Sequence, residues 1–309
     1  MVATLVLNEN NIVPDGFNNK LVYSFPNSVS FPNHEIAIQS INMYYSWQNI
    51  NSTTLQNNSY WFSWPASTFV SIQIVMPDGL YEISDMNSYL QFIMIQNGFY
   101  LYTTAGVNMY FAEFVVNPSN YSIQINTYAI PTTIPTGYLS PTNWRAPIGA
   151  NYAPVISTYD TTYSPIRTNT ISNFYKIIGY SQIFATNSQI TNVSFTANSY
   201  TSSVAPQVQP NPVLYASVSN IENKYATPSS IIGTVSPSVA FGDLITEIPP
   251  QFAWNKMLPG TYNGLRLALL GSDISQIKIL DPNITIVLVI RDIKDNGLKD
   301  ALEKANGGK

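Results

Sequence analysis

The sequence predicts an all-β fold, a single jelly roll (an eight-stranded β-sandwich) with one amphipathic helix in a connection and a long loop-rich insertion. Three observations lead to this class. About eight to ten segments have the alternation or apolar character of strands. One segment alone has a convincing helical stripe. Prolines are frequent between residues 131 and 212. Closed sandwiches suit this number of strands because they limit exposed sheet edges.

The predicted helix lies between two groups of strands. Ser84 is the expected N-cap, and Asp85 complements the helix dipole. Gly98 is expected to end the helix, because glycine readily adopts the left-handed conformation. Strands are expected to follow at residues 107–116 and 121–129. The apolar stripe consists of Met86, Tyr89, Leu90, Ile93 and Met94.

The longest early strand is predicted over residues 35–50 and contains a change of phase. Its apolar residues start on one parity and continue on the other, so a one-residue bulge near Gln39 and Ser40 would return all of them to the core. These residues are Ile36, Ile38, Ile41, Met43, Tyr45 and Trp47. A shorter strand at 21–25 is expected to end at Pro26 and Asn27.

Other strands follow from alternation or from apolar runs bounded by turn residues. They are residues 60–64, 70–76, 213–219, 231–235, 265–270, 277–280 and 284–290. The last is apolar at nearly every position, which fits a central strand buried on both faces and equally fits a pairing edge. A short helix is expected at 173–180, ending at Gly179.

Four regions follow from these patterns. Residues 1–19 are expected to form an N-terminal arm, and residues 20–130 with 213–291 the jelly-roll domain. The intervening residues 131–212 form the loop-rich insertion, because their proline density excludes long regular elements. Residues 292–309 form a charged C-terminal tail.

The composition is poor in charge. Charged residues make up 10% of the chain, against roughly 25% in typical soluble domains. A neutral polar surface costs less to desolvate and therefore suits burial against protein neighbours. A secreted β protein, or one from an AT-rich genome, is the alternative reading. The net charge of −4 and the lack of a basic stripe argue against nucleic-acid binding.

The absence of cysteine excludes disulfides, thiolate catalysis and cysteine-based zinc sites. Residues 2–7 are too short and lack the basic start of a signal peptide. No apolar run reaches the roughly 18 residues that a membrane helix needs. We therefore expect a chain made in the cytosol or nucleus without export by a cleaved signal.

Two groups of titratable residues are candidate sites. His34 beside Glu35 forms a possible base, although no nucleophile or third orienting group accompanies it, and a surface turn is the favoured interpretation. A hard cation suits the second group, for which turn and helix-dipole roles are favoured. This group is Asp78, Glu82 and Asp85.

The tail partly matches a calcium loop. Asp292, Asn296, Gly297 and Glu303 take ligand or turn positions, but Lys294 stands where a ligand oxygen is required. We therefore expect no calcium there. Glycosylation sequons, expected by chance in this composition, begin at Asn51, Asn57, Asn120, Asn192 and Asn283.

Aromatic residues near the early strands suit stacking on sugars, although core and subunit-interface packing is favoured. They are Tyr44, Tyr45, Trp47, Tyr60, Trp61 and Trp64. No phosphate-binding glycine loop, zinc spacing or nucleophile elbow occurs. The sequence thus predicts no catalytic, cofactor-binding or metal-binding residues, and no cofactor.

Several stretches resemble the minor capsid (penton) proteins of virophages and polinton-like viruses. They are Val22-Tyr-Ser-Phe25, Glu35-Ile-Ala-Ile-Gln-Ser-Ile-Asn-Met-Tyr-Tyr-Ser-Trp47, Gly79-Leu-Tyr-Glu-Ile-Ser-Asp-Met-Asn-Ser-Tyr-Leu90, Ile177-Ile-Gly-Tyr180 and Asp281-Pro-Asn-Ile-Thr-Ile-Val-Leu-Val-Ile-Arg291. The resemblance implies a jelly roll, often with an insertion, whose pentamers close the fivefold vertices of an icosahedral capsid. It implies a homopentamer beside major capsid (hexon-like) neighbours in the virion, and it implies no catalytic residues.

Two alternatives stay open: a minor protein that cements hexon-like capsomers, and a carbohydrate-binding jelly-roll module. An enzyme is the least favoured class, given a single histidine and no cysteine. Gly307-Gly308 resembles the di-glycine cut sites of related viral maturation proteases, and a flexible end is the simpler interpretation.

Overall fold

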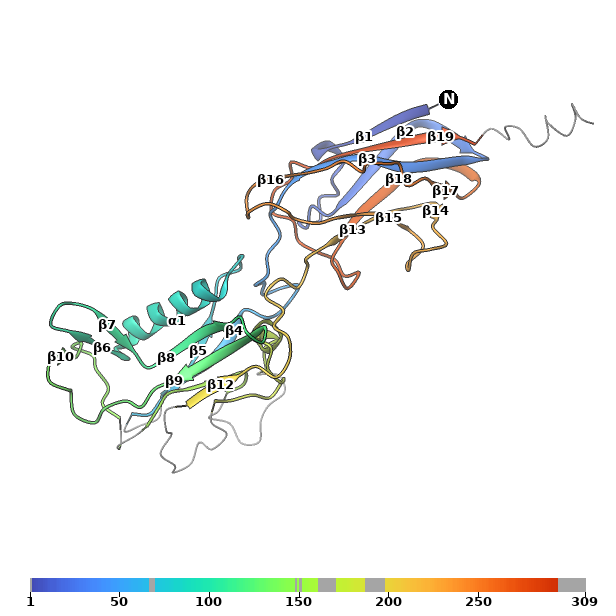
Figure 1. Cartoon of the computed structure of the whole chain (residues 1–309). Helices are drawn as coiled ribbons and strands as arrows, with labels where there is room; N and C mark the ends of the chain where they lie inside the picture. The colour runs from blue at the N-terminus through green and yellow to red at the C-terminus, as the bar shows by residue number, and fades with distance from the viewer. Residues whose placement is uncertain are drawn as a thin grey trace, which may run out of the picture. The chain divides into compact units, whose positions relative to one another are not determined.

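The computed structural model describes residues 2–66, 70–147, 149, 152–160, 171–186 and 198–293. The chain divides into two compact units, and Figure 1 shows the elements of each. Unit 1 comprises Met1–Trp47 and Asn211–Lys309, and unit 2 comprises Gln48–Pro210. The described residues form mostly β structure in several sheets, in agreement with the all-β prediction.

The part of unit 1 that the structure describes forms two antiparallel sheets. The first has the strand order β1 (Val2–Leu7), β19 (Thr285–Asp292), β3 (His34–Tyr44), β17 (Asn255–Met257) and β14 (Ile221–Glu222), and β16 (Leu244–Glu247) also pairs with β3. The second has the order β15 (Ile231–Val235), β13 (Leu214–Val218), β18 (Gly260–Leu270) and β2 (Lys20–Phe31). A 3-10 turn, η1 (Glu9–Asn11), joins β1 to β2.

The two sheets of unit 1 face each other across an apolar core. A Cβ atom added to Gly233 in β15 would lie 2.7 Å from the Cδ1 atom of Ile38 in β3. Fully buried side chains come from both sheets, as a sandwich requires. They include Leu7, Ile36, Ile41, Met43, Ile286 and Leu288 from the first sheet and Leu21, Leu214, Ala216, Val218 and Leu269 from the second.

The predicted bulge in β3 is confirmed. Ser40 lies opposite Val287 and Ile38 lies opposite Leu288, so Gln39 is the extra residue. Its side chain is exposed. The six apolar residues on the two parities are all buried, as expected. One inserted residue therefore reconciles the change of phase with a single buried face.

β19 is the central strand that its apolar sequence allowed. It lies between β1 and β3 and pairs with both along most of its length. Leu288, Val289 and Ile290 are buried in succession. The pairing-edge alternative for this strand is therefore wrong.

The N-terminal arm expected over residues 1–19 is instead part of unit 1. β1 pairs with β19. The polar segment between β1 and β2 is held in place by amide side chains. Asn18 Nδ2 donates to the carbonyl of Ile279 at 2.9 Å, and Asn19 Nδ2 donates to that of Leu269 at 3.0 Å. A polar segment lies against the sheet because its amides replace ladder hydrogen bonds.

The strand expected to stop at Pro26 continues to Phe31. β2 is an edge strand, so the missing N–H of Pro26 costs little ladder pairing. The proline also lies where the register shifts, between Ser24, which pairs with Gly264, and Val29, which pairs with Tyr262.

The described residues of unit 2 form three small antiparallel sheets and two helices. The sheet orders are β11 (Val155–Ser157), β4 (Ser59–Trp64), β5 (Val70–Val75); β12 (Asn198–Thr201), β9 (Ser122–Thr127), β8 (Ala112–Asn117); and β10 (Tyr138–Leu139), β6 (Tyr100–Thr103), β7 (Asn108–Tyr110). The helices are α1 (Ile83–Asn97) and α2 (Phe174–Ile178). Much of the core is aromatic.

The unit boundaries differ from the regions expected from sequence. We placed residues 48–130 in the jelly-roll domain and began the insertion at 131, whereas all of 48–210 forms unit 2. The described part of 131–212 contains β10, β11, β12 and α2, so it consists of more than loops. These elements are short, as the proline density predicts.

Helix α1 begins earlier than expected. Glu82 is its N-cap, and the carboxylate of Asp85 accepts from the Glu82 N–H at 2.8 Å. Glu82 and Asp85 form a capping box, in which the side chain of each accepts from the backbone N–H of the other. Ser84, the predicted cap, therefore lies inside the helix. Gly98 ends the helix at φ 71°, and Gly179 ends α2 at φ 73°, both as predicted. Of the predicted stripe, Met86, Leu90 and Met94 are buried, and Tyr89 and Ile93 are half-buried.

Candidate functional site

His34 and Glu35 have different partners and do not form a dyad. The Glu35 carboxylate pairs with Arg291, whose terminal nitrogen lies 2.7 Å from Oε2. The same guanidinium lies 4.0 Å from the ring centroid of Trp254. His34 packs edge-on against Phe31 at a centroid distance of 5.2 Å. The imidazole therefore has a packing role, and its Nδ1 atom is buried without a hydrogen-bond partner among the described residues.

The acidic group near α1 has turn and capping roles. Asp78 accepts from the N–H of Ser52 at 2.7 Å and from its hydroxyl at 3.1 Å. Asp85 caps the helix at Glu82. Among the described residues, no three histidine, cysteine, aspartate or glutamate side chains lie close enough together to hold a metal ion. Of the stretch that partly matches a calcium loop, Lys294, Asn296, Gly297 and Glu303 lie outside the described residues, as does nearly all of the charged tail, including Gly307-Gly308.

Most of the aromatic residues near the early strands lie in the core, in agreement with the favoured interpretation, and do not stack on sugars. Tyr45, Trp47, Tyr60 and Trp64 are buried. Trp64 stacks on Phe99 at 4.7 Å, with an interplanar angle of 10°. Of the other two, Tyr44 is 37% exposed and Trp61 is half-buried. These aromatic rings form no sugar platform because burial against neighbouring strands takes their faces.

Two of the five sequons are also buried. The side chain of Asn51 accepts from the N–H of Thr54 at 2.7 Å, and Asn57 Nδ2 donates to the carbonyl of Asn49 at 2.8 Å. These amides organise the polar loop before β4 and are inaccessible to a glycan in the folded chain. Asn120 and Asn283 are exposed, and Asn192 lies outside the described residues.

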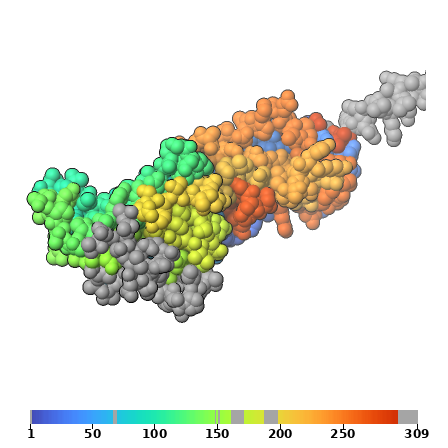
Figure 2. Space-filling model, turned by 60° about the horizontal axis from the view of Figure 1, so that its bottom comes forward, coloured from blue at the N-terminus to red at the C-terminus, as the bar shows by residue number. Residues whose placement is uncertain are grey.

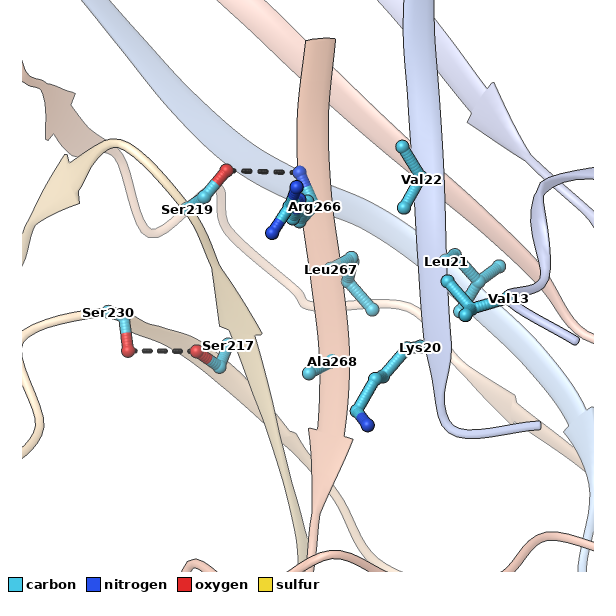
Figure 3. Close-up of a pocket in the computed structure, with 10 residues that line it drawn as sticks. All are labelled: Val13, Lys20, Leu21, Val22, Ser217, Ser219, Ser230, Arg266, Leu267 and Ala268. Atoms are coloured by element: carbon cyan, nitrogen blue, oxygen red, sulfur yellow. Dashed lines mark hydrogen bonds between the residues drawn. The ribbon is translucent and has the colours of Figure 1, made fainter. Parts of the chain in front are cut away.

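A hollow of about 520 Å³ lies over β13, β18 and β2 in unit 1 (Figure 3). Figure 3 shows Arg266 and Lys20 at separate places along it, with Leu267 and Ala268 between them. Lys20 Nζ lies 3.0 Å from the Asp15 carboxylate. Its hydrogen bond holds the pKa of Asp15 below the ordinary value. Among the described residues that line it, the hollow therefore offers one cation without an ion-pair partner, Arg266.

The serines of this hollow are already engaged. The Ser217 hydroxyl donates to that of Ser230 at 2.8 Å, and Ser219 Oγ accepts from the Arg266 N–H at 3.0 Å. A single guanidinium beside engaged hydroxyls can attract a carboxylate. The described lining of the hollow contains neither a nucleophile beside a base nor a set of metal ligands, so it offers no evident catalytic chemistry.

An apolar flank borders the first sheet on the side of β16 and β17. We use this name for Phe241, Leu244, Ile248, Phe252 and Leu258. Each is a large apolar side chain at least 43% exposed, and Ile248 reaches 66%. Figure 2 shows the surrounding segment, coloured orange, at the surface. The recurrence of large exposed apolar side chains within one segment makes the flank a candidate interaction surface.

Sequence reasoning missed the apolar flank. The five residues follow neither helical nor strand periodicity, because most lie in irregular chain around two short strands. Their signal was the recurrence of large apolar residues among prolines in a stretch without periodicity. Such a stretch belongs to a surface more often than to a core.

Strand β1 forms the opposite edge of the same sheet. Its sequence Val-Ala-Thr-Leu-Val-Leu carries no charge, and its side chains of Val2 and Val6 are exposed. Edge strands present unpaired N–H and C=O groups, and natural proteins usually protect them with charge, proline or a covering element. An uncharged edge is therefore suited to pairing with another chain.

Comparisons with known proteins do not assign the chain to a family. No family model matches the chain, and no curated protein matches. Among solved structures, the chain is similar to the SeMet-labelled mavirus penton protein at 10% identity and a TM-score of 0.39, over 95% of this chain and 99% of that one. No helix among the described residues is long and apolar enough to cross a bilayer.

Proposed function

We propose that this chain is a structural virion protein, a penton (minor capsid) subunit whose pentamers occupy the fivefold vertices of an icosahedral capsid. The observation that carries the proposal is the strand order of unit 1. It is supported by the neutral composition, by the apolar flank and by the sequence stretches that resemble penton proteins.

Successive strands of unit 1 alternate between the two sheets, except that β16 and β17 both belong to the first sheet. The chain passes from β1 to β2 to β3, enters unit 2, and returns to β13, with β19 as the last strand. The orders β1-β19-β3-β16/β17 and β2-β18-β13-β15 support a jelly roll, in which the first and last strands are neighbours, with β14 as a short additional strand beside β17. Unit 2 then takes the place of the insertion, between the third and fourth strands. Viral capsid domains and lectins both use this fold, so further features must decide between them.

The surface favours assembly. Interface cores are depleted in charge and enriched in aromatic side chains. In unit 1 the uncharged β1 edge and the apolar flank lie on opposite sides of one sheet. Two different surfaces on one subunit are what a cyclic assembly needs, because its interface is heterologous and closes when the rotation closes. The partners are then further copies of this chain and the major capsid neighbours, and the location is the virion.

The alternatives fare differently. A protein that cements hexon-like capsomers would use the same neutral flanks and remains the second candidate. A carbohydrate-binding jelly roll that uses the aromatic residues of β4 and of the segment after β3 is disfavoured, because Trp47, Tyr60 and Trp64 are buried. No observation favours an enzyme.

Electron cryomicroscopy of the native particle tests the proposal. We expect density for unit 1 at the fivefold vertices in five copies. Density of this fold only between hexon-like capsomers would favour the cementing protein and overturn the penton. A particle-free monomer in infected cells would overturn both.

A further inference from the structure

Unit 2 carries an aromatic hollow, which we define by its lining residues. They are Tyr100 and Tyr102 of β6, Asn108 of β7, and Pro141, Thr142 and Asn143 of the loop after β10. The hollow is open to solvent and has a volume of about 530 Å³. We propose that it binds a neutral oligosaccharide. This inference is independent of the capsid role, and its residues differ from the aromatic residues buried in the core.

The tyrosines share one face of the sheet. Tyr100 and Tyr102 are two residues apart in β6, so their side chains point to the same side. Tyr100 pairs with Tyr110 and Tyr102 with Asn108 across the β6–β7 ladder. Ring centroids lie 6.2 Å apart for Tyr100 and Tyr102, and 6.4 Å apart for Tyr100 and Tyr110. The intervening Leu101 is buried on the other face. Three half-buried rings therefore lie side by side, with interplanar angles of 37° between Tyr100 and Tyr102 and 35° between Tyr100 and Tyr110, and the first two line the hollow.

The rim of the hollow is fixed to the body of unit 2. Asn143 Nδ2 donates to the carbonyl of Gln96 at 3.3 Å, and a Cβ atom on Gly98 would lie 2.6 Å from the Asn143 carbonyl oxygen. The next residue, Trp144, packs on Trp64 at 5.6 Å. A glycine at 98 therefore serves the close approach of this loop as well as the end of α1. A rigid rim reduces the ordering that binding requires.

The polar atoms of the hollow require both donors and acceptors from a ligand. Asn108 Nδ2 donates to the Tyr110 hydroxyl at 3.0 Å, which leaves its Oδ1 free to accept. The hydroxyls of Tyr100, Tyr102 and Thr142 have no partner among the described residues. A polyol supplies both kinds of group at close spacing. A proline-rich peptide also suits aromatic grooves, but its prolines bring no N–H to the free amide oxygen.

None of the described residues that line the hollow is charged. An acidic ligand or a phosphate would require a cation to replace its hydration, and none is present. A pyranose ring instead has an apolar C–H face, which suits the face of a tyrosine, and a rim of hydroxyls. The chemistry of the site thus selects a neutral sugar.

Saturation-transfer NMR on the full chain tests the proposal with four probes: the β-1,4-linked tetramers of glucose and N-acetylglucosamine, maltotetraose and mannotetraose. We expect at least one probe to show transfer concentrated on its ring protons. Tyr102→Ala should weaken that binding about tenfold, because it removes one stacking face. Tyr225→Ala is the matched control, since Tyr225 is fully exposed in unit 1, and it should bind as the original chain does.

A second variant keeps the test independent of the tyrosines. Thr142→Trp places a bulky side chain at the exposed rim and should block the probe while Tyr100 and Tyr102 remain. Binding should not change between about 50 and about 500 mM salt, because no charge lines the site. Failure of all four probes, undiminished binding by both variants, or binding of a proline decamer alone would each overturn the assignment.

Discussion

The side-chain oxygen of Asn87 in α1 accepts a 3.0 Å hydrogen bond from the backbone N–H of Phe114 in β8. Phe114 lies on the edge of its sheet, where that N–H has no strand partner. The same helix reaches a second edge, because the Tyr89 hydroxyl donates to the carbonyl of Val75 in β5 at 2.9 Å. One helix thus covers the edges of two sheets, which is one way in which proteins protect them.

Replacing Asn87 tests this covering role. Asn87→Leu leaves the Phe114 N–H beneath an apolar side chain, so we expect a loss of about 1–3 kcal/mol in the free energy of unfolding. Urea titration followed by circular dichroism measures it. Gln96→Ala, at an exposed position of the same helix, should change stability by less than about 0.5 kcal/mol. Equal effects of the two variants would contradict the prediction.

Two buried tyrosines should respond oppositely to loss of their hydroxyls. The Tyr60 hydroxyl is buried and has no hydrogen-bond partner among the described residues. Burial raises the pKa of Tyr60 above its ordinary value, so the phenol stays neutral. We expect Tyr60→Phe to leave the Tm unchanged or to raise it, because an unsatisfied polar group disappears.

Tyr180 is the matched comparison. Its hydroxyl lies within hydrogen-bond distance of the carbonyls of Ile123 and Tyr200, and burial also raises its pKa. Tyr180→Phe should lower stability by about 1 kcal/mol, since a satisfied hydrogen bond is lost. Calorimetry of both variants decides the matter, and a Tyr60→Phe variant that melts well below Tyr180→Phe would refute the pair of predictions.

The Asp15–Lys20 pair predicts a pH dependence. The hydrogen bond from Lys20 and the one from the Phe17 N–H keep the pKa of Asp15 below its ordinary value. A depressed folded pKa contributes stability that is present above the unfolded pKa and is lost as the pH falls through the folded one. Asp15→Asn should therefore lower the Tm at pH 7, by a small amount because the pair is exposed.

That difference should shrink toward zero as the pH falls through the unfolded and then the folded pKa of Asp15. Thermal melts across the acidic range measure it. Asp243→Asn, at another exposed carboxylate of unit 1, is the control. A deficit of Asp15→Asn that grows as the pH falls would reverse the expected sign and exclude the pair as its cause.

The apolar flank predicts an assembly phenotype. Ile248→Asp places a charge on an exposed apolar position of the flank, so we expect weaker self-association, by about tenfold or more in dissociation constant, with an unchanged monomer Tm. Tyr225→Asp adds the same charge at a fully exposed position outside the flank. Mass photometry over a concentration series compares them. Identical behaviour of the two variants would remove the flank from the proposed interface.

Local sequence patterns determined the all-β class, the ends of both helices at Gly98 and Gly179, and the bulge at Gln39. Each depends on groups close together in the chain: the alternation of side chains in a strand, or the left-handed conformation that glycine readily adopts. Even the change of phase in β3 could be read without knowing its partner, because a buried face tolerates only one parity.

Tertiary structure alone decided which segments belong together. The start of unit 2 at Gln48, the continuation of β2 past Pro26, the burial of Tyr60 and Trp64, and the exposure of the apolar flank all depend on contacts between residues far apart in sequence. A local pattern specifies that a side chain has an apolar face but not which neighbour covers it. That choice is made by packing, which is settled only when the whole chain folds.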